Sequence, residues 1–334
     1  MRRITIGVIG CGKQAEDTHL PNLISIPEAK LVALSDINQE RLGRLGKEYN
    51  INKLYSDYNE LLELDLDAVV ICTPTPTHAT VARTAAMKKK HVFIEKPIAM
   101  TVEDAKSVLD AADMNHVKMM VGFQMRFLPN HIKVREMIRS GRIGRILIAE
   151  VHSETLQIKP EDGILLDYGI HFFDLLRWYF QGNEVVEVSA VVGKSDRNQF
   201  TTVTLKFSNE TIGHLSLYWV PSYASWERVE RYVRFIGENG KITTDQSSPV
   251  IRLYKPGTLL SRTKGYHQIM LPFAIHPSLP ISATTYRREL EEFINAVRQD
   301  RPASISAYDG LMAIKIAEAA RESSQTGNSV RIIA

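Results

Sequence analysis

Near its N-terminus the chain reads Ile4-Thr5-Ile6-Gly7-Val8-Ile9-Gly10-Cys11-Gly12-Lys13-Gln14-Ala15. The apolar, β-branched start is typical of a buried strand, and the residues after Ala15 suit a helix. Between a strand and a helix, Gly10 permits a tight turn, Gly12 lets the backbone approach a pyrophosphate, and Ala15 allows close packing. The order strand, glycine turn and helix therefore predicts a dinucleotide site at the edge of a parallel sheet.

The first 122 residues continue this alternation of short apolar strands and amphipathic helices. Several strands are apolar almost throughout, as strands are when helices cover both faces of a sheet. With right-handed crossovers, the pattern predicts an α/β domain with a doubly wound parallel sheet over residues 1–122. The strands are expected at residues 4–9, 31–36, 68–72, 91–94 and 118–121, with a weaker one at 53–55.

Beyond a helix expected at residues 129–140, longer strands follow one another with few helices between them. This pattern predicts an α+β domain over residues 123–334 with a large, mostly antiparallel open sheet. Its strands are expected at residues 146–153, 185–192, 201–207, 211–219 and 229–236, and its further helices at 169–180, 283–298 and 307–323.

The composition excludes several classes of function. The 334 residues include 41 basic and 38 acidic side chains, a formal net charge of +3, so no strong field favours nucleic acid or an acidic membrane as partner. No apolar run reaches the roughly 18 residues that a membrane span needs. Cys11 and Cys72 cannot form a disulfide framework and have no zinc-site spacing, which favours a reducing, cytoplasmic location and no metal.

Asp36 ends the second expected strand, where an acid accepts hydrogen bonds from the ribose of a dinucleotide. A carboxylate there repels a 2′-phosphate, so NAD is favoured over NADP, although the nearby Arg41 could weaken the preference. The alternative is that Asp36 only caps the next helix.

Two further segments follow expected strands at the carboxyl edge of the sheet, where open α/β folds bind ligands. The first reads Cys72-Thr73-Pro74-Thr75-Pro76-Thr77-His78, and the second reads Glu95-Lys96-Pro97. A lysine placed directly after a buried strand and before a proline is more typical of a site than of a solvated surface.

These motifs resemble those of the Gfo/Idh/MocA family, the glucose-fructose oxidoreductase and inositol dehydrogenase type. The likeness also includes Gly122-Phe123-Gln124-Met125-Arg126-Phe127 and Asp167-Tyr168-Gly169-Ile170-His171-Phe172-Phe173-Asp174, in the family's order. It implies a Rossmann domain that binds NAD, catalysis by Lys96, Asp167 and His171, and a cis peptide bond before Pro97. The implied cofactor contacts are Gly10, Gly12, Lys13, Gln14, Ala15, Asp36, Thr73, Pro74, Thr75, His78, Glu95, Lys96 and Gln124, and the implied substrate contacts are Lys96, Arg126, Asp167 and His171.

The implied chemistry suits these side chains. Asp167 and His171 are four residues apart, so they share one face of a helix or its first turn. With an ordinary pKa near 6.5, an imidazole can take a hydroxyl proton as the hydride leaves, and an ammonium can hold the oxygen. Either Lys96 or His171 can be the terminal base, and Asp167 can bind substrate hydroxyls or orient His171. Asp174 is expected to be structural, bonded within its own helix or to neighbouring backbone.

One segment departs from the family pattern. Members often carry a glycine run before the aspartate, whereas residues 155–163 of this chain have only Gly163 in place. The substrate therefore cannot be transferred from relatives, and Lys159, Glu161 and Asp162 are expected in a solvated loop rather than on the substrate.

The sequence thus predicts an NAD-dependent dehydrogenase or reductase acting on a sugar, a sugar derivative or a cyclitol. Two alternatives stay open: a redox-neutral NAD-dependent glycosidase and a non-catalytic dinucleotide or sugar sensor. By resemblance, a homodimer or homotetramer is expected to form through the second domain's sheet.

Overall fold

A computed structural model describes residues 2–156, 163–195, 199–219, 230–245, 250–255, 265–270 and 281–332. The chain divides into two compact units. The first comprises Met1–Gln124 with Ser282–Ile314, and the second Met125–Ile281 with Lys315–Ala334. The sequence analysis placed residues 123–334 in one domain. In the structure, the segment 282–314 belongs to the same compact unit as residues 1–124.

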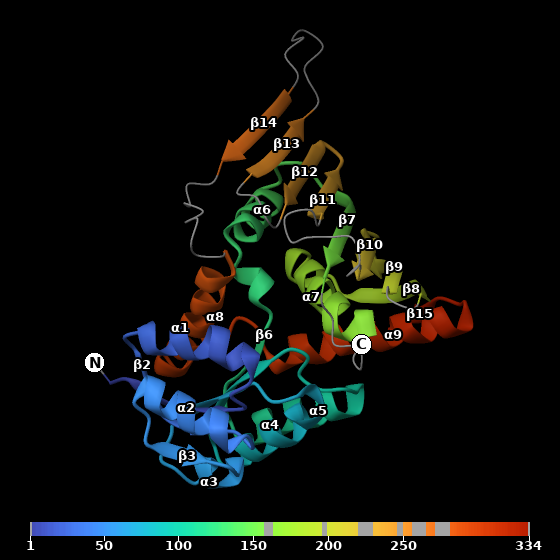
Figure 1. The fold of residues 1–334 in the computed structure, drawn as a ribbon. Coiled ribbons are helices and arrows are strands. Elements are labelled where there is room, and N and C mark those ends of the chain that lie inside the picture. Colours follow the sequence, from blue (N-terminus) through green and yellow to red (C-terminus); the bar gives the residue numbers. More distant parts are fainter. Residues whose placement is uncertain are drawn as a thin grey trace. The chain divides into compact units, whose positions relative to one another are not determined.

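The first unit contains the predicted parallel sheet, in the strand order β3-β2-β1-β4-β5-β6 (Figure 1). Its strands are β1 (Ile4–Ile9), β2 (Ala29–Ser35), β3 (Lys53–Tyr55), β4 (Ala68–Ile71), β5 (His91–Glu95) and β6 (Met119–Gly122). The connecting helices are α1 (Leu20–Ser25), α2 (Gln39–Tyr49), α3 (Tyr58–Leu62), α4 (His78–Met87) and α5 (Val102–Met114). Two shorter helices, the π-helix η1 (Ala15–His19) and the 3-10 helix η2 (Thr75–Thr77), precede α1 and α4. The predicted strands are confirmed to within two residues at each end.

Local sequence explains these elements. All four residues of β4 are fully buried, as expected for a central strand covered on both faces. The hydroxyl of Thr101 caps the start of α5 by accepting a hydrogen bond from the Asp104 N–H. Asn38 caps α2 in the same way by accepting from the Arg41 N–H.

The segment 282–314 packs into the core of the first unit. It includes α8 (Ile281–Arg298) and the first residues of α9 (Ala307–Thr326). The ring of Phe293 lies edge-on to Phe93 of β5, with centroids 5.9 Å apart, and both rings are buried. The carbonyl of Ile305 accepts from the Val121 N–H of β6. Burying these apolar side chains stabilises the first unit.

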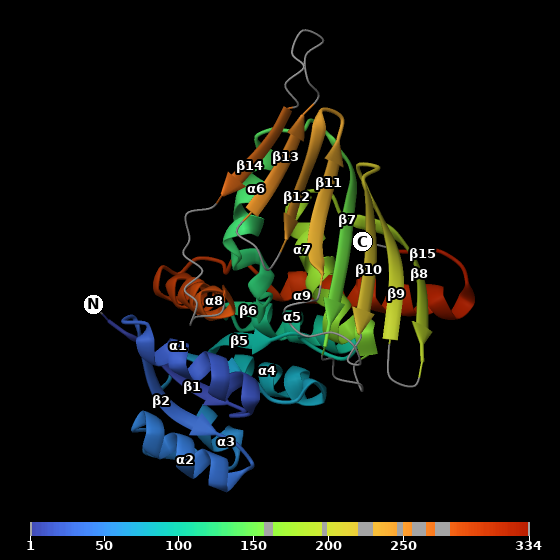
Figure 2. The same cartoon turned by 45° about the horizontal axis from the view of Figure 1, so that its top comes forward.

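The second unit contains a nine-stranded sheet in the order β14-β13-β12-β11-β7-β10-β9-β8-β15 (Figure 2). Its strands are β7 (Ile146–Thr155), β8 (Val185–Lys194), β9 (Gln199–Phe207), β10 (Ile212–Trp219), β11 (Arg231–Gly237), β12 (Gly240–Asp245), β13 (Val250–Lys255), β14 (Gly265–Met270) and β15 (Val330–Arg331). Among the described strands of this sheet, only β7 and β10 pair in parallel, so the expected mostly antiparallel sheet is confirmed. The sequence analysis did not identify the strands from β12 to β15.

Helices α6 (Pro129–Arg139) and α7 (Ile170–Tyr179) lie on one face of this sheet (Figure 2). The strands alternate accordingly: Gly213, Leu215 and Leu217 of β10 are buried, whereas His214 between them is exposed. The buried side chains form one core with Phe172, Phe173 and other apolar residues of α7. Two further short helices are the 3-10 helix η3 (Gln124–Phe127) and the π-helix η4 (Ile164–Gly169), which directly precedes α7.

Candidate active site

The turn after β1 has the geometry that its glycines predict. Gly10 has a φ of +85°, and a Cβ added there would lie 2.6 Å from the backbone nitrogen of Thr73. A Cβ added at Gly12 would meet no described atom within 4 Å, so the backbone there is open to an approaching group. Ala15 is fully buried, and Lys13 is exposed and pairs with Asp17 at 2.5 Å.

Asp36 ties this turn to the end of β2. Its Oδ2 accepts a hydrogen bond from the Cys11 N–H at 2.7 Å, and its Oδ1 accepts from the Asn38 N–H at 2.7 Å. The guanidinium of Arg41 lies 3.6 Å from the same Oδ2. Because Asn38 caps α2, the competing interpretation of Asp36 as the helix cap is not needed. Binding of the cofactor ribose by Asp36 stays a prediction.

His78 joins the two loops at the carboxyl edge of the first sheet. Its Nε2 lies 2.7 Å from the Thr73 carbonyl oxygen, and its Nδ1 lies 2.6 Å from the Pro97 carbonyl oxygen. Carbonyls only accept, so both contacts are hydrogen bonds when the imidazole carries both protons. His78 therefore braces the loops from inside the protein, and its expected contact with the cofactor stays a prediction.

The Glu95-Lys96-Pro97 segment leaves β5 at this edge, and its Lys96–Pro97 peptide bond is cis, as the resemblance predicted. Oε1 of Glu95 lies 2.7 Å from His19 Nε2 and accepts from Gln14 Nε2 at 3.2 Å. Burial raises the pKa of Glu95, but the hydrogen bond and charge of His19, with the charge of Lys96, outweigh this effect and lower it. Glu95 is therefore an ionised carboxylate beside Lys96, which is half-buried.

In the second unit, Asp167 lies on η4 and His171 lies on the first turn of α7. Both side chains are buried, at 8% and 7% exposure. The four-residue spacing crosses the junction between the π-helix η4 and the α-helix α7. Single-turn π-helical segments occur frequently at functional sites. The segment begins at Gly163, whose φ of +70° favours glycine.

Tyr168 anchors this segment to the sheet. Its hydroxyl donates to the Glu154 carbonyl of β7 at 3.1 Å and lies 2.5 Å from the Ser153 hydroxyl. Burial raises the pKa of Tyr168, so it remains a neutral donor. The sequence analysis did not assign a role to this residue, although it lies between the two predicted catalytic residues.

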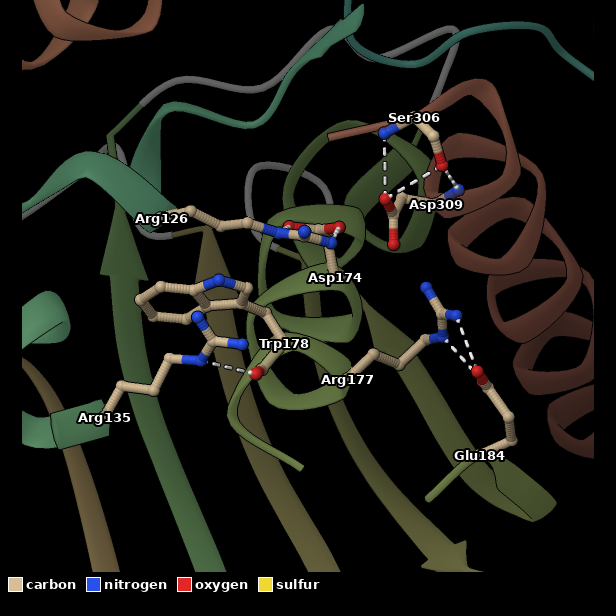
Figure 3. Close-up of polar contacts among 8 residues, drawn as sticks. All are labelled: Arg126, Arg135, Asp174, Arg177, Trp178, Glu184, Ser306 and Asp309. Atoms are coloured by element: carbon tan, nitrogen blue, oxygen red, sulfur yellow. Dashed lines mark hydrogen bonds and ion pairs between the residues drawn. The ribbon is translucent and has the colours of Figure 1, made fainter. Parts of the chain in front are cut away.

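Arg126 is buried against Asp174 of α7 (Figure 3). Nε of Arg126 donates to Asp174 Oδ2 at 2.8 Å, and Nη2 donates to Oδ1. The carboxylate of Asp174 thus binds a side chain 48 residues away, a partner that the sequence analysis did not expect. The guanidinium of Arg126 is engaged within the protein, and the substrate contact predicted for it stays a prediction.

The other predicted residues differ in exposure, and some of them lie outside the described part of the chain. Pro74 is exposed, Thr75 is buried, and Gln124 is partly buried at the start of η3. Lys159, Glu161 and Asp162 lie outside the described residues. The sequence analysis missed His19 and Tyr286, which line the buried side of Glu95 and Gln14, because 76 residues separate His19 from Glu95.

The first unit fits a dinucleotide at this edge. The open backbone at Gly12 leaves room for a pyrophosphate, and the Thr73 hydroxyl is buried without a hydrogen-bond partner among the described residues. Within the described ranges, no group of three His, Cys, Asp or Glu side chains could hold a metal ion. None of the described helices is long and apolar enough to cross a membrane.

Known proteins match both units. The oxidoreductase family profile with an NAD-binding Rossmann fold matches residues 4–123, and the profile of its C-terminal alpha/beta domain matches residues 135–332. The chain is 30% identical to the myo-inositol 2-dehydrogenase of Thermotoga maritima, over 98% of each protein. It is 29% identical to the uncharacterized oxidoreductase YrbE of Bacillus subtilis, over 99% of this chain and 97% of that protein.

Solved structures share the whole fold. A probable dehydrogenase from Thermotoga maritima superposes with a TM-score of 0.82 at 28% identity, covering 98% of both chains. A putative myo-inositol dehydrogenase from Sinorhizobium meliloti 1021 superposes with a TM-score of 0.81 at 26% identity, covering 99% of this chain and 100% of that chain. With both profiles matched in order, this chain belongs to the Gfo/Idh/MocA family of oxidoreductases, and its residues 4–123 form the family's NAD-binding Rossmann domain.

Proposed function

We propose that this protein transfers a hydride between NAD and a secondary hydroxyl or carbonyl carbon of a sugar-like substrate, and that the substrate class is the cyclitols. The observation that supports the proposal is the presence of all three family residues, in the family's sequence order and within the described part of the chain: Lys96, Asp167 and His171. The relative named myo-inositol 2-dehydrogenase, similar over 98% of the chain, supports the cyclitol class.

The three side chains divide the work of the reaction. NAD, when bound, supplies the hydride acceptor. Lys96 holds the substrate oxygen by a charge-assisted hydrogen bond. His171 takes the hydroxyl proton during oxidation and returns it during reduction, and Asp167 accepts hydrogen bonds from neighbouring hydroxyls or orients His171. Gly10, Gly12, Ala15 and Asp36 hold the dinucleotide at the edge of the first sheet.

A test is to follow NADH absorbance while the protein is mixed with NAD and each of several cyclitols, sugars and nucleotide sugars. The proposal expects NADH to accumulate with at least one inositol. Lys96→Ala should lower the rate by about a hundredfold to a thousandfold, in line with the loss of one transition-state donor. The matched control is Lys106→Ala, because Lys106 is an exposed lysine on α5.

The two alternatives give different results in the same assay. A redox-neutral glycosidase would cleave a glycoside without net NADH, and a sensor would bind without turnover. Undiminished activity of Lys96→Ala would remove Lys96 from the proposed mechanism.

We also propose that two or four copies assemble through the sheet of the second unit. The support is the exposure of apolar side chains on neighbouring strands, Val191 of β8 at 68% and Phe200 of β9 at 46%. Light scattering of the intact protein tests this assembly, and a monomeric mass would refute it. A reducing, cytoplasmic location is proposed from the two unpaired cysteines.

A further inference from the structure

A buried carboxylate connects two segments of the cofactor edge that lie far apart in sequence. Oε1 of Glu95 contacts His19 at 2.7 Å and Gln14 at 3.2 Å, and both partners come from the segment that follows the glycine turn. Oε2 of Glu95 accepts from the Lys96 backbone N–H at 3.2 Å. One carboxylate thus joins the dinucleotide turn to the peptide of the predicted catalytic lysine.

Of these hydrogen bonds to Glu95, the one from His19 is the shortest, and the His19 ring has few other polar contacts. The side chain is fully buried, with its ring edge-on to Phe93 at 5.4 Å and to Tyr286 at 6.0 Å. Its Nδ1 makes no hydrogen bond within the described residues. Among those residues, Glu95 is therefore the one hydrogen-bond partner of the imidazole, through Nε2.

The carboxylate depends on its donors because its surroundings are buried. Burial favours the protonated form of Glu95, whereas the hydrogen bond and charge of His19 and the charges of Lys96 and His78 favour the ionised form. The titratable or charged groups that face this cluster are His19 of η1, Cys72 after β4, His78 of α4, Lys96, and Tyr286 and Glu289 of α8. Loss of the shortest hydrogen bond, from His19, should therefore favour protonation of Glu95.

We propose that His19 is a positioning residue for cofactor binding: its Nε2 holds the Glu95 carboxylate, and that carboxylate holds Gln14 and the Lys96 peptide in the arrangement that binds NAD. His19 lies outside both the glycine turn and the lysine motif. The role rests on NAD binding by the first unit and concerns neither the substrate nor the identity of the terminal base.

Replacing His19 has a consequence that a purely structural role would not produce. In His19→Leu, Glu95 gains a proton as the pH falls, and a protonated oxygen can no longer accept from all its donors. NAD affinity should then weaken at acid pH and recover at alkaline pH. The ratio of variant to wild-type dissociation constants isolates this effect, because titrations common to both proteins cancel.

The experiment is calorimetric titration of the full-length protein with NAD, without substrate, from about pH 5.5 to about pH 8.5. The expected ratio for His19→Leu is about tenfold or more at the acid end and falls toward one at the alkaline end. His19→Gln, which keeps an N–H donor, should show a nearly flat ratio. The double variant His19→Leu/Glu95→Gln should show no pH dependence, because the titrating group is gone.

Two further variants keep the test decisive. His19→Asn is polar but too short to reach Glu95, and it carries the same expectation as His19→Leu if the leucine variant fails to fold. His131→Leu removes another fully buried histidine, one that contacts a tyrosine hydroxyl in the second unit, and it should leave NAD affinity unchanged.

A ratio for the folded His19 variants that stays constant across the pH range would overturn the proposal. Survival of the pH dependence in the double variant would also overturn it. Because substrate is absent, either result leaves the proposed dehydrogenase activity standing. Conversely, a protein that binds NAD as expected but oxidises no cyclitol would refute that activity alone.

Discussion

The guanidinium of Arg126 and the carboxylate of Asp174 form a buried ion pair within the second unit, with 7% and 1% of the side chains exposed (Figure 3). Asp174 lies on α7 less than one turn after His171, so the pair fixes the helix that carries a predicted catalytic residue. Nearby, Arg135 stacks on Trp178 of the same helix, with its guanidinium 4.3 Å from the ring centroid. These contacts hold α7 against the segment 126–135.

Removing one member of this pair should destabilise the protein strongly. Asp174→Asn leaves the Arg126 charge buried without its counter-ion, which costs about 3–5 kcal/mol. The double variant Arg126→Met/Asp174→Leu should cost less than Asp174→Asn, because no uncompensated charge remains. Urea denaturation measures the free energies of unfolding, and a double variant at least as destabilised as Asp174→Asn would contradict the account.

His131 should make the second unit sensitive to acid. Its Nδ1 lies 2.6 Å from the Tyr179 hydroxyl, and complete burial lowers the pKa of His131 to about 3. Below about pH 6.5, His131 therefore binds a proton in the unfolded chain but not in the folded chain. The free energy of unfolding falls as the pH drops from about 6.5 toward 3.

The loss due to His131 between about pH 6.5 and pH 5 is about 2 kcal/mol, because each pKa unit corresponds to about 1.36 kcal/mol. In His131→Gln this contribution disappears, so urea midpoints at neutral and acid pH should lie closer together than in the wild type. An unchanged difference between the two midpoints would show that His131 titrates normally.

Asp36 should control the choice between NAD and NADP. In Asp36→Ser, the loss of carboxylate repulsion and of ribose contacts should reduce the preference for NAD over NADP by about tenfold or more. Asp57→Ser is the matched control, because Asp57 also accepts a backbone hydrogen bond but caps α3 after β3. Dissociation constants for both cofactors measure the effect, and a wild type that binds NADP more tightly would refute the assignment.

The two thiols should be unreactive in the native protein. Burial and the neighbouring Asp36 carboxylate raise the pKa of Cys11 to about 12, and burial raises the pKa of Cys72 well above its usual range. Since the thiolate is the nucleophile, a disulfide reagent near neutral pH should label neither residue until denaturant is added. Labelling at the rate of a free cysteine would contradict the described packing around β1 and β4.

Sequence reasoning located the parallel sheet of the first unit well because its signals are local. The run from Ile4 to Ala15 contains strand, turn and helix start in twelve consecutive residues, and β4 is apolar throughout. Strands such as β12 (Gly240–Asp245) escaped prediction because they are short and half polar, and register with β11 rather than local sequence stabilises them.

Long-range pairs were beyond the sequence for a different reason. Nothing local places His19 beside Glu95 or Arg126 beside Asp174, since these contacts depend on how distant elements pack. The segment 282–314 illustrates the same limit, because its apolar face suits either unit until Phe293 is seen against Phe93. The position of Lys96 after a buried strand marked it as a site residue, whereas Asp167 and His171 were identified through the resemblance of their motifs.

Hydride transfer itself can be followed with a labelled substrate. The protein is incubated with NAD and an inositol carrying deuterium on each ring carbon, and the nucleotide product is analysed by mass spectrometry. The account predicts NADH one mass unit heavier than normal, with Lys96→Ala forming almost none. Unlabelled NADH, or deuterium released to water with no labelled nucleotide, would contradict the claim that this protein moves a hydride from a cyclitol carbon to NAD.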